Sequence, residues 1–309
     1  MILNIRPSLL SNPRRLVQSP LVLHQLGGKM TDTPQSLKPT RAPVGNAQPP
    51  SNGLFRMVRT VVALILREIA TTYGRSPGGY IWALADPILG IALLTLIFEH
   101  VLGRTSPLIG TSFPLFYASG YIPFLMYNDI GNKVAQSLRY SRPLLAYPAV
   151  TFADALIARL ILNSVLHTVV FTVLIIGISV AQRIPLVLDV SVVLHALALT
   201  ALLGAGIGTM NCFLIMRFPV WERAWSILNR PLFLMSGIFF TYEVMPSVAR
   251  DVLWWNPVLH IVGLMRRGIY GIYPADYVSE SYVVAVSLIT MLSGLLLLWR
   301  RYRTLLELH

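Results

Sequence analysis

The sequence contains little of what a redox protein or metalloprotein needs. Cys212 is the only cysteine among 309 residues, so neither an intrachain disulfide nor a cysteine-based metal site can form. The six histidines are scattered, with no i, i+4 pairing and no carboxylate at metal-ligand spacing. We therefore expect no metal site and no redox chemistry.

Charge is also scarce. Charged residues make up 12% of the chain and hydrophobic residues 55%, which is outside the range of ordinary water-soluble domains. Lipid is therefore the expected solvent for most of the chain. The formal net charge of +12 does not indicate nucleic-acid binding. Beyond the N-terminal region, the basic residues stand mostly at the ends of apolar runs, where they set topology and contact headgroups.

The motifs of catalytic and nucleotide-binding proteins are missing as well. The nearest match to a phosphate-binding loop, LGGKM at 26–30, lacks the upstream glycine and the hydroxyl residue. The sequence has no nucleophile elbow, no His-Glu-x-x-His and no paired carboxylates within one expected element. These absences argue against an enzyme and against ATP binding by this chain.

What the sequence does contain predicts an all-α integral membrane protein. Residues 1–53, rich in Pro, Ser, Asn and Gln, predict a disordered cytoplasmic tail, and 55–73 predict an amphipathic helix in the cytoplasmic interface. A transmembrane domain is expected over 54–303, followed by a cytoplasmic C-terminus at 304–309. Six spans are expected, at about 82–101, 113–131, 155–180, 188–215, 225–241 and 282–299.

Two segments of this domain are unusual. The second span carries several tyrosines and Asp129, so it should face the protein interior rather than lipid. The stretch between the fifth and sixth spans is aromatic and broken by prolines, which predicts short re-entrant helices at the outer interface. In the fourth span, Gly204 and Gly208 form a small-xxx-small pair that favours close helix packing over a phosphate loop.

Basic residues near the span ends predict the orientation. With a cytoplasmic N-terminus, the outer segments hold Arg104, Arg183, Arg250, Arg266 and Arg267, and the inner segments hold a much larger set. We therefore expect both termini in the cytoplasm.

Three segments in order, REIATTYGRSPGGYIWALADPI, RPLLAYPAVTFADALIAR and SGIFFTYEVMP followed by WWNPVLHIVGLMRRG, resemble the permeases of ABC-2 type polysaccharide exporters, capsule-export branch. The resemblance covers about residues 55–303. It departs from the family pattern at Gly263, where an acidic residue often stands, which puts a charge pair with Arg266 in doubt.

The resemblance implies a homodimer in the bacterial inner membrane, with each subunit docked on a separate cytoplasmic ATPase that binds ATP and Mg²⁺. The implied cargo is a lipid-linked capsular polysaccharide delivered to the periplasm, with periplasmic and outer-membrane export components as further partners. No cofactor is expected in this chain.

Two groups of site residues are expected. Aromatic and charged residues that could replace the water around a sugar polymer are candidates for a substrate conduit: Tyr117, Tyr121, Tyr127, Asp129, Trp254, Trp255, Arg266, Arg267, Tyr270 and Tyr273. The short proline-bounded inner loop is a candidate for ATPase coupling, with Arg142, Leu145, Tyr147, Asp154 and Arg159.

Simpler interpretations stay open for both groups. The outer aromatics could form an interfacial anchoring belt, and Asp154 and Arg159 could be a helix-start charge and a snorkelling cation. For the function, the alternatives are an ABC-2 exporter of O-antigen, teichoic-acid precursors, lipids or drugs, and a membrane-embedded transferase.

Overall fold

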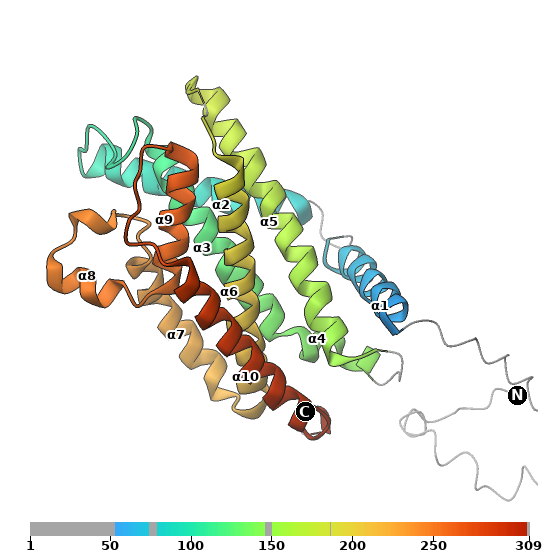
Figure 1. The fold of residues 1–309 in the computed structure, drawn as a ribbon. Helices are drawn as coiled ribbons and strands as arrows, with labels where there is room; N and C mark the ends of the chain where they lie inside the picture. The colour runs from blue at the N-terminus through green and yellow to red at the C-terminus, as the bar shows by residue number, and fades with distance from the viewer. Residues whose placement is uncertain (1–52, 74–78, 146–149, 186, 308–309) are drawn as a thin grey trace, which may run out of the picture. The chain divides into compact units, whose positions relative to one another are not determined.

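The computed structural model describes residues 53–73, 79–145, 150–185 and 187–307. Every regular element in these ranges is a helix (Figure 1), so the all-α prediction is confirmed for this part of the chain. The expected tail lies outside the described residues apart from Gly53, as do Tyr147 and residues 308–309.

Four helical segments are long and apolar enough to cross a membrane: Ile81–Val101, Phe152–Gln182, Val190–Arg217 and Glu280–Arg301. The first combines α2 (Gly79–Leu96) with the π-helical turn η4 (Ile97–Val101), and the others lie in α5 (Phe152–Gln182), α6 (Val190–Arg217) and α10 (Glu280–Glu307). They correspond to the expected first, third, fourth and sixth spans.

The expected second and fifth spans form helices that are less apolar. The second is α3 (Phe113–Ala135) and the fifth is α7 (Val220–Met235), which carries Glu222, Arg223 and Arg230. The helix does not continue to Thr241 as expected, because Gly237 adopts a positive φ of 75° directly after the C-cap Ser236. A left-handed residue of this kind ends a helix.

Close packing around α6 forms the centre of the bundle, with α3 on one side and α10 on the other (Figure 1). A Cβ added at Gly208 would lie 2.7 Å from the Gly131 carbonyl oxygen of α3, and one at Gly204 would lie 3.0 Å from Ile130 Cβ. On the opposite side, a Cβ at Gly206 would collide with the backbone of α10 at Ser287. The predicted packing role of the glycine pair is therefore confirmed.

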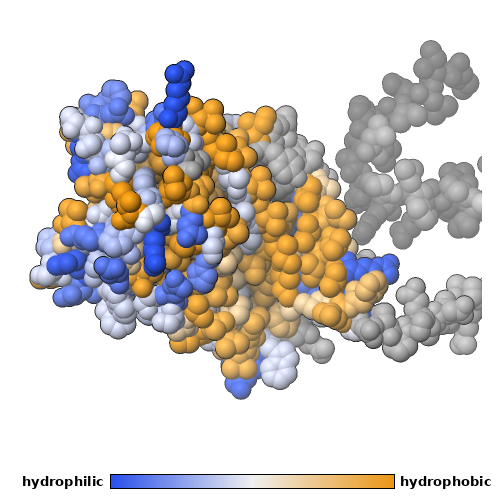
Figure 2. Space-filling view, turned by 45° about the horizontal axis from the view of Figure 1, so that its top comes forward, coloured by the Kyte–Doolittle hydropathy of each residue, from blue (hydrophilic) through white to orange (hydrophobic). Residues whose placement is uncertain are grey.

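The outward faces of the long helices are apolar, as burial in lipid requires. Figure 2 shows broad hydrophobic areas on one face of the molecule. On α5, exposed apolar residues recur at helical spacing: Ile161, Val165, Val169, Val173, Ile176 and Val180. Within the part of the chain that the structure describes, these side chains are left uncovered, and such a face suits contact with acyl chains.

Shorter elements surround this core. The helix α1 (Gly53–Glu68) continues into the π-helical turn η3 (Ile69–Tyr73) and packs against α5. Between α7 and α10 lie the 3₁₀ turn η5 (Tyr242–Val244) and two helices, α8 (Ser247–Leu253) and α9 (Pro257–Tyr270), and α9 packs on α3, α6 and α10. The helix α4 (Ser137–Leu145) follows α3 directly.

Candidate functional site

A polar stripe runs along α3. From residue 121 onward, the half-exposed positions of α3 and its C-cap recur every three or four residues and therefore share one face. They are Tyr121, Leu125, Asn128, Asp129, Asn132, Lys133 and Gln136. All but Leu125 are polar, and we call this set the polar stripe. A helix with such a face suits the protein interior or a hydrated path better than lipid.

Side chains from neighbouring helices hold the polar stripe. Asn128 accepts hydrogen bonds from Asn132 Nδ2, at 3.1 Å, and from the amide of Asn229 on α7. Asp129 lies 3.0 Å from His167 Nε2 on α5. The stripe is thus bordered by α7 on one side and by α5 on the other.

The structure separates the four conduit candidates of the second span. Tyr121 and Asp129 belong to the polar stripe, whereas Tyr117 and Tyr127 are buried in the core. The ring of Tyr117 packs among Phe98, Phe113 and Phe116. Their positions leave Tyr121 and Asp129 as the two that face the half-exposed side of α3.

At the opposite end of the bundle, Arg266 on α9 is buried, with 1% of its surface exposed. Its guanidinium donates to the carbonyl oxygens of Phe240, at 2.8 Å, and Ile238, at 3.2 Å. Its carbon Cζ lies 4.3 Å from the ring centroid of Phe116 on α3. Arg266 therefore connects α9 to α3 and to the turn after α7. Position 263 is a glycine, so it has no carboxylate that could form a charge pair with Arg266.

The two tryptophans belong to an aromatic cluster around His260. The rings of Trp254 and Tyr282 lie 5.3 and 5.4 Å from that of His260, and Trp255 lies on the exposed side, with 68% of its surface accessible. His260 Nε2 lies 2.7 Å from the Trp254 carbonyl oxygen, and Nδ1 accepts from the Ser279 backbone N–H at 3.1 Å. One nitrogen thus donates and the other accepts, as in a neutral imidazole.

The remaining outer candidates have different surroundings. Arg267 is exposed, and Tyr270 is half-buried over Gly110. Tyr273 is buried, and its hydroxyl donates to the Glu243 carboxylate at 2.9 Å. Burial, the neighbouring Tyr277 and the Glu243 carboxylate raise the pKa of Tyr273, so the phenol stays protonated and remains a donor.

The predicted coupling segment consists of α4 and the start of α5. Arg142 is exposed at the end of α4, Leu145 is half-buried against the core, and Tyr147 lies outside the described residues. Asp154 forms a capping box: its carboxylate accepts from the Thr151 backbone N–H at 2.8 Å, and its own N–H donates to the Thr151 hydroxyl at 3.2 Å. The simpler interpretation of Asp154 as a helix-start charge accounts for these contacts.

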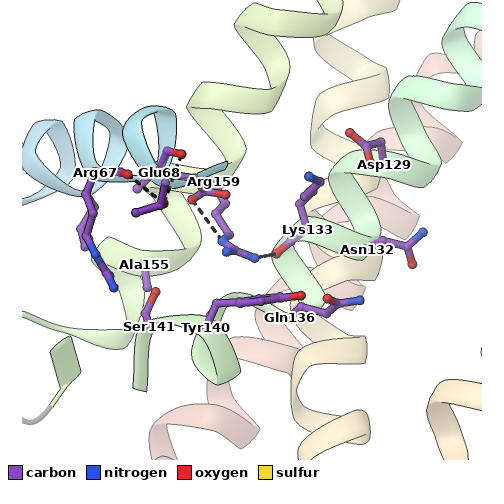
Figure 3. A pocket seen from close by; sticks show the side chains of 13 residues that line it. Arg67, Glu68, Asp129, Asn132, Lys133, Gln136, Tyr140, Ser141, Ala155 and Arg159 are labelled. Carbon is purple, nitrogen blue, oxygen red and sulfur yellow. Dashed lines mark hydrogen bonds and ion pairs between the residues drawn. The ribbon is translucent and has the colours of Figure 1, made fainter. Parts of the chain in front are cut away.

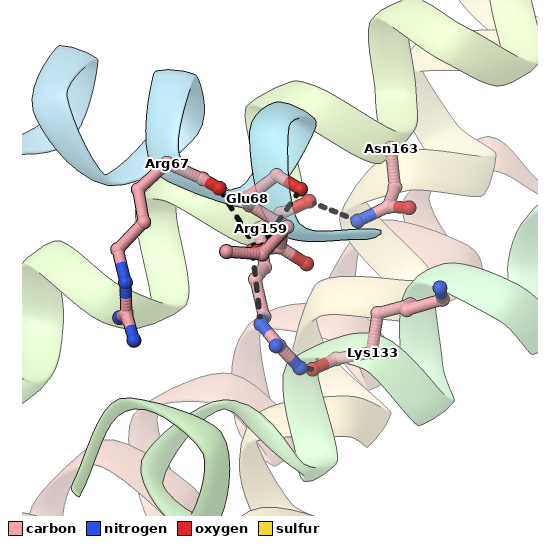
Figure 4. A network of polar contacts seen from close by, with 6 residues as sticks. Arg67, Glu68, Lys133, Arg159 and Asn163 are labelled. Atoms are coloured by element: carbon pink, nitrogen blue, oxygen red, sulfur yellow. Dashed lines mark hydrogen bonds and ion pairs between the residues drawn. The ribbon is translucent and has the colours of Figure 1, made fainter. Parts of the chain in front are cut away.

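Arg159 joins four helices at this end (Figures 3 and 4). Its Nε lies 3.2 Å from the Glu68 carboxylate of α1, and its Nη1 donates to the Lys133 carbonyl oxygen of α3 at 2.9 Å. Its Cζ lies 4.8 Å from the Tyr140 ring centroid on α4. We call Arg159, Glu68 and Tyr140, together with the Lys133 carbonyl, the Arg159 junction.

Several of these contacts could not be predicted from local sequence. Glu68, Lys133 and His167 were not among the site candidates, because their partners lie far away in the chain. A charged residue on the inner face of an amphipathic helix was the only available signal for Glu68. Among the residues that the structure describes, no three His, Cys, Asp or Glu side chains are grouped as metal ligands.

Comparison with known proteins agrees with this architecture. The model of the family "ABC-2 type transporter" matches residues 59–270. The chain belongs to this family. The match extends from α1 to the end of α9, so it includes the polar stripe, the Arg159 junction and Arg266. An ABC-2 transporter chain is an integral membrane component of a transporter rather than an enzyme, and the apolar helices agree with this assignment.

Three relatives of this ABC-2 chain illustrate its similarity to named proteins. The polysialic acid transport protein KpsM of Escherichia coli is 32% identical over 79% of this chain and 93% of its own length. The capsule polysaccharide export inner-membrane proteins BexB of Haemophilus influenzae and CtrC of Neisseria meningitidis are 28% and 25% identical, each over 77% of this chain and 89% of its own length.

Proposed function

We propose that this ABC-2 chain is the permease subunit of an ATP-driven exporter that moves lipid-linked capsular polysaccharide from the cytoplasm to the periplasm. The observation that carries the proposal is the similarity to a polysialic acid transport protein and to two capsule polysaccharide export proteins, over more than three quarters of the chain. Family membership alone would leave exporters of O-antigen, teichoic-acid precursors, lipids or drugs as candidates.

The polar stripe supports a conduit for a hydrated polymer. Sugars lose water in the roughly 30 Å hydrocarbon layer, so a path across it must offer polar or aromatic partners. Tyr121 offers a ring face and a hydroxyl to a sugar, and the amides of Asn128 and Asn132 offer donors and acceptors. In this proposal, Tyr121 and Asp129 line the path, and two copies of the chain enclose it.

The membrane arrangement is part of the same proposal. The protein lies in the inner membrane with both termini in the cytoplasm, α3 and α7 complete the set of six spans, and α8 and α9 are re-entrant at the periplasmic side. Trp254, Trp255, Arg267, Tyr270 and Tyr273 then surround the periplasmic mouth. The basic inner segments and the polar interruptions between α7 and α10 support this orientation.

ATP hydrolysis takes place on a separate subunit in this proposal, because the sequence lacks a phosphate-binding loop. The exposed end of α4, with Arg142, contacts that subunit. Substituting Arg142→Glu should leave the permease in the membrane and reduce co-purification of the ATPase. Arg59→Glu, on the exposed face of α1, is the control that should retain it.

Deletion of the gene in its own host tests the cargo. The proposal predicts loss of surface polysaccharide and intracellular accumulation of lipid-linked polymer, both reversed by the chain supplied from a plasmid. An unchanged capsule together with the loss of a drug-resistance phenotype would favour the drug-exporter alternative.

A further inference from the structure

An apolar cavity of about 220 Å³ lies where four helices of the bundle meet. The helix α10 packs on α6, whereas α5 packs mainly on α3, and the cavity occupies the space between them. Its lining comes from all four helices: Val134 on α3, Ala153, Leu156, Ile157 and Leu160 on α5, Ala205 and Thr209 on α6, and Met291 and Leu295 on α10.

This lining offers almost nothing to water. Among the nine described residues around the cavity, only Thr209 has a polar side chain. Its hydroxyl already donates to the Ala205 carbonyl oxygen, at 2.7 Å within α6. A buried water needs about two to four polar partners, whereas apolar cavities of about 150 Å³ stay dry and take up apolar molecules. The cavity therefore suits an apolar ligand.

The cavity opens toward the lipid-facing side of the bundle. Its α5 wall includes Ile157 and Leu160, which are half-exposed, and the same helix continues with the exposed Val165. Its α10 wall adjoins Leu292 and Leu296, which are 61% and 47% exposed. The cavity is therefore continuous with the apolar faces of two membrane-spanning helices, where acyl chains are the solvent.

The end of α10 indicates the depth of the cavity in the membrane. Met291, Leu295 and Trp299 follow one another at i, i+4 spacing and therefore share one face of the helix. Trp299 is 68% exposed and precedes Arg300 and Arg301, a combination typical of the headgroup level. The two lining residues lie about one and two helical turns deeper. A lipid with its headgroup beside Trp299 has its acyl chains at the depth of the cavity.

We propose that the cavity is a binding site for one acyl chain of a membrane phospholipid, inserted between α5 and α10. The inserted chain fills the space left by the small side chains of Ala153 and Ala205, so that the surrounding side chains regain the dispersion contacts that an empty cavity lacks. It also contacts Leu160, next to Arg159 on α5. The inference rests on the membrane-spanning helices and not on the identity of the exported polymer.

The test is photolabelling of the full-length chain in proteoliposomes. A trace of phosphatidylethanolamine with a diazirine midway along one acyl chain is included, and labelled residues are located by mass spectrometry after irradiation. Label on Val165, which is 59% exposed, reports the surrounding lipid. Leu156 and Thr209 are only 5% and 3% exposed and line the cavity, so their label reports an inserted chain. The expected result is label on all three residues.

Filling the cavity should separate the two kinds of labelling. Ala153→Phe and Ile157→Phe each place a ring in the space and should abolish the label on the two cavity residues, while the label on Val165 remains. Ala181→Phe makes the same change at an exposed position of α5 outside the cavity lining. It is the matched control and should retain all three labels.

Label on Val165 without label on either cavity residue of the wild-type chain would overturn the proposal. Cavity label that persists in both filled variants would do the same. The remaining occupant is a second copy of the chain. An unlabelled cavity, together with a disulfide between two Ile157→Cys chains in a Cys212→Ser background, would identify that copy in place of the lipid. None of these outcomes depends on polysaccharide export, so the proposed function is tested separately.

Discussion

The Arg159 junction allows a quantitative prediction, because its central ion pair is largely buried. The side chains of Arg159 and Glu68 are 10% and 16% exposed. Leaving one member of a buried pair without its partner typically costs about 3 to 5 kcal/mol. Since some water reaches this pair, we expect Glu68→Gln to lower the free energy of unfolding by about 2 to 3 kcal/mol.

Arg159→Met should be more damaging. It removes the ion pair, the hydrogen bond to the Lys133 carbonyl and the contact with the Tyr140 ring. A charged hydrogen bond adds about 1.5 kcal/mol or more, so we expect a loss of about 4 kcal/mol in total. The Glu68→Gln and Arg159→Met double variant leaves no unpaired carboxylate. It should therefore be about 2 kcal/mol more stable than the sum of the single effects implies.

The assay is reversible unfolding of the purified chain in mixed micelles, as a double-mutant cycle. The pair Arg139–Glu222 is the matched control: its 3.2 Å separation is the same, but its side chains are 47% and 44% exposed. Its coupling energy should be below about 0.5 kcal/mol. Coupling at Glu68–Arg159 no larger than this control would refute the reasoning that burial makes the junction structurally important.

Other predictions address packing, topology and the outer turn. Gly208→Ala places a Cβ 2.7 Å from the Gly131 carbonyl oxygen and should lower the free energy of unfolding by about 1 to 3 kcal/mol. The control Gly177→Ala, with open space around it, should be neutral or stabilising in the same unfolding assay. Equal effects of the two substitutions would argue against tight packing of α3 on α6. A cysteine at Ile272, which is 83% exposed, should react with an impermeant thiol reagent added to spheroplasts. A cysteine at Val220, which is 76% exposed, should react only after the membrane is opened. The reverse pattern would show that the proposed orientation in the membrane is wrong. Arg266→Lys should lower the free energy of unfolding by about 2 kcal/mol, because a lysine cannot reproduce both carbonyl contacts of the guanidinium. Wild-type stability of this variant would show that these contacts contribute little.

Some features of this chain could be predicted from local sequence because a single helix determines them. The polar character of the second expected span predicted a helix facing the interior, and its half-exposed face is the polar stripe. Gly204 and Gly208 predicted close packing, and α3 does approach them closely. In both cases helical periodicity brings together residues that are three or four apart in the chain.

Other features depended on contacts between distant segments. Arg266 was predicted to line the outer mouth of a substrate conduit. In the structure α9 is buried on nearly all sides, and the arginine donates to carbonyls that precede it by 26 and 28 positions. No periodicity distinguishes a buried arginine satisfied by backbone from an exposed one. Glu68 and Arg159 meet for the same kind of reason, since only the packing of α1 on α5 brings them together.

The predicted end of the fifth span differs from the structure, because a single residue determines where that helix ends. The expected fifth span extended to Thr241 because the apolar run continues through Ile238 and Phe240. The left-handed conformation of Gly237 ends the helix earlier and directs two carbonyls of the following turn toward Arg266. Hydropathy alone does not register that change of direction.

Transport in inverted membrane vesicles tests the central claim most directly. Vesicles that contain the chain and its ATPase are supplied with lipid-linked capsular polysaccharide on the outer, formerly cytoplasmic, surface, and a capsule-degrading glycosidase is added after incubation with ATP. The account predicts that polymer becomes protected from the enzyme only with ATP and only when this chain is present. ATP hydrolysis without any protected polymer would contradict it.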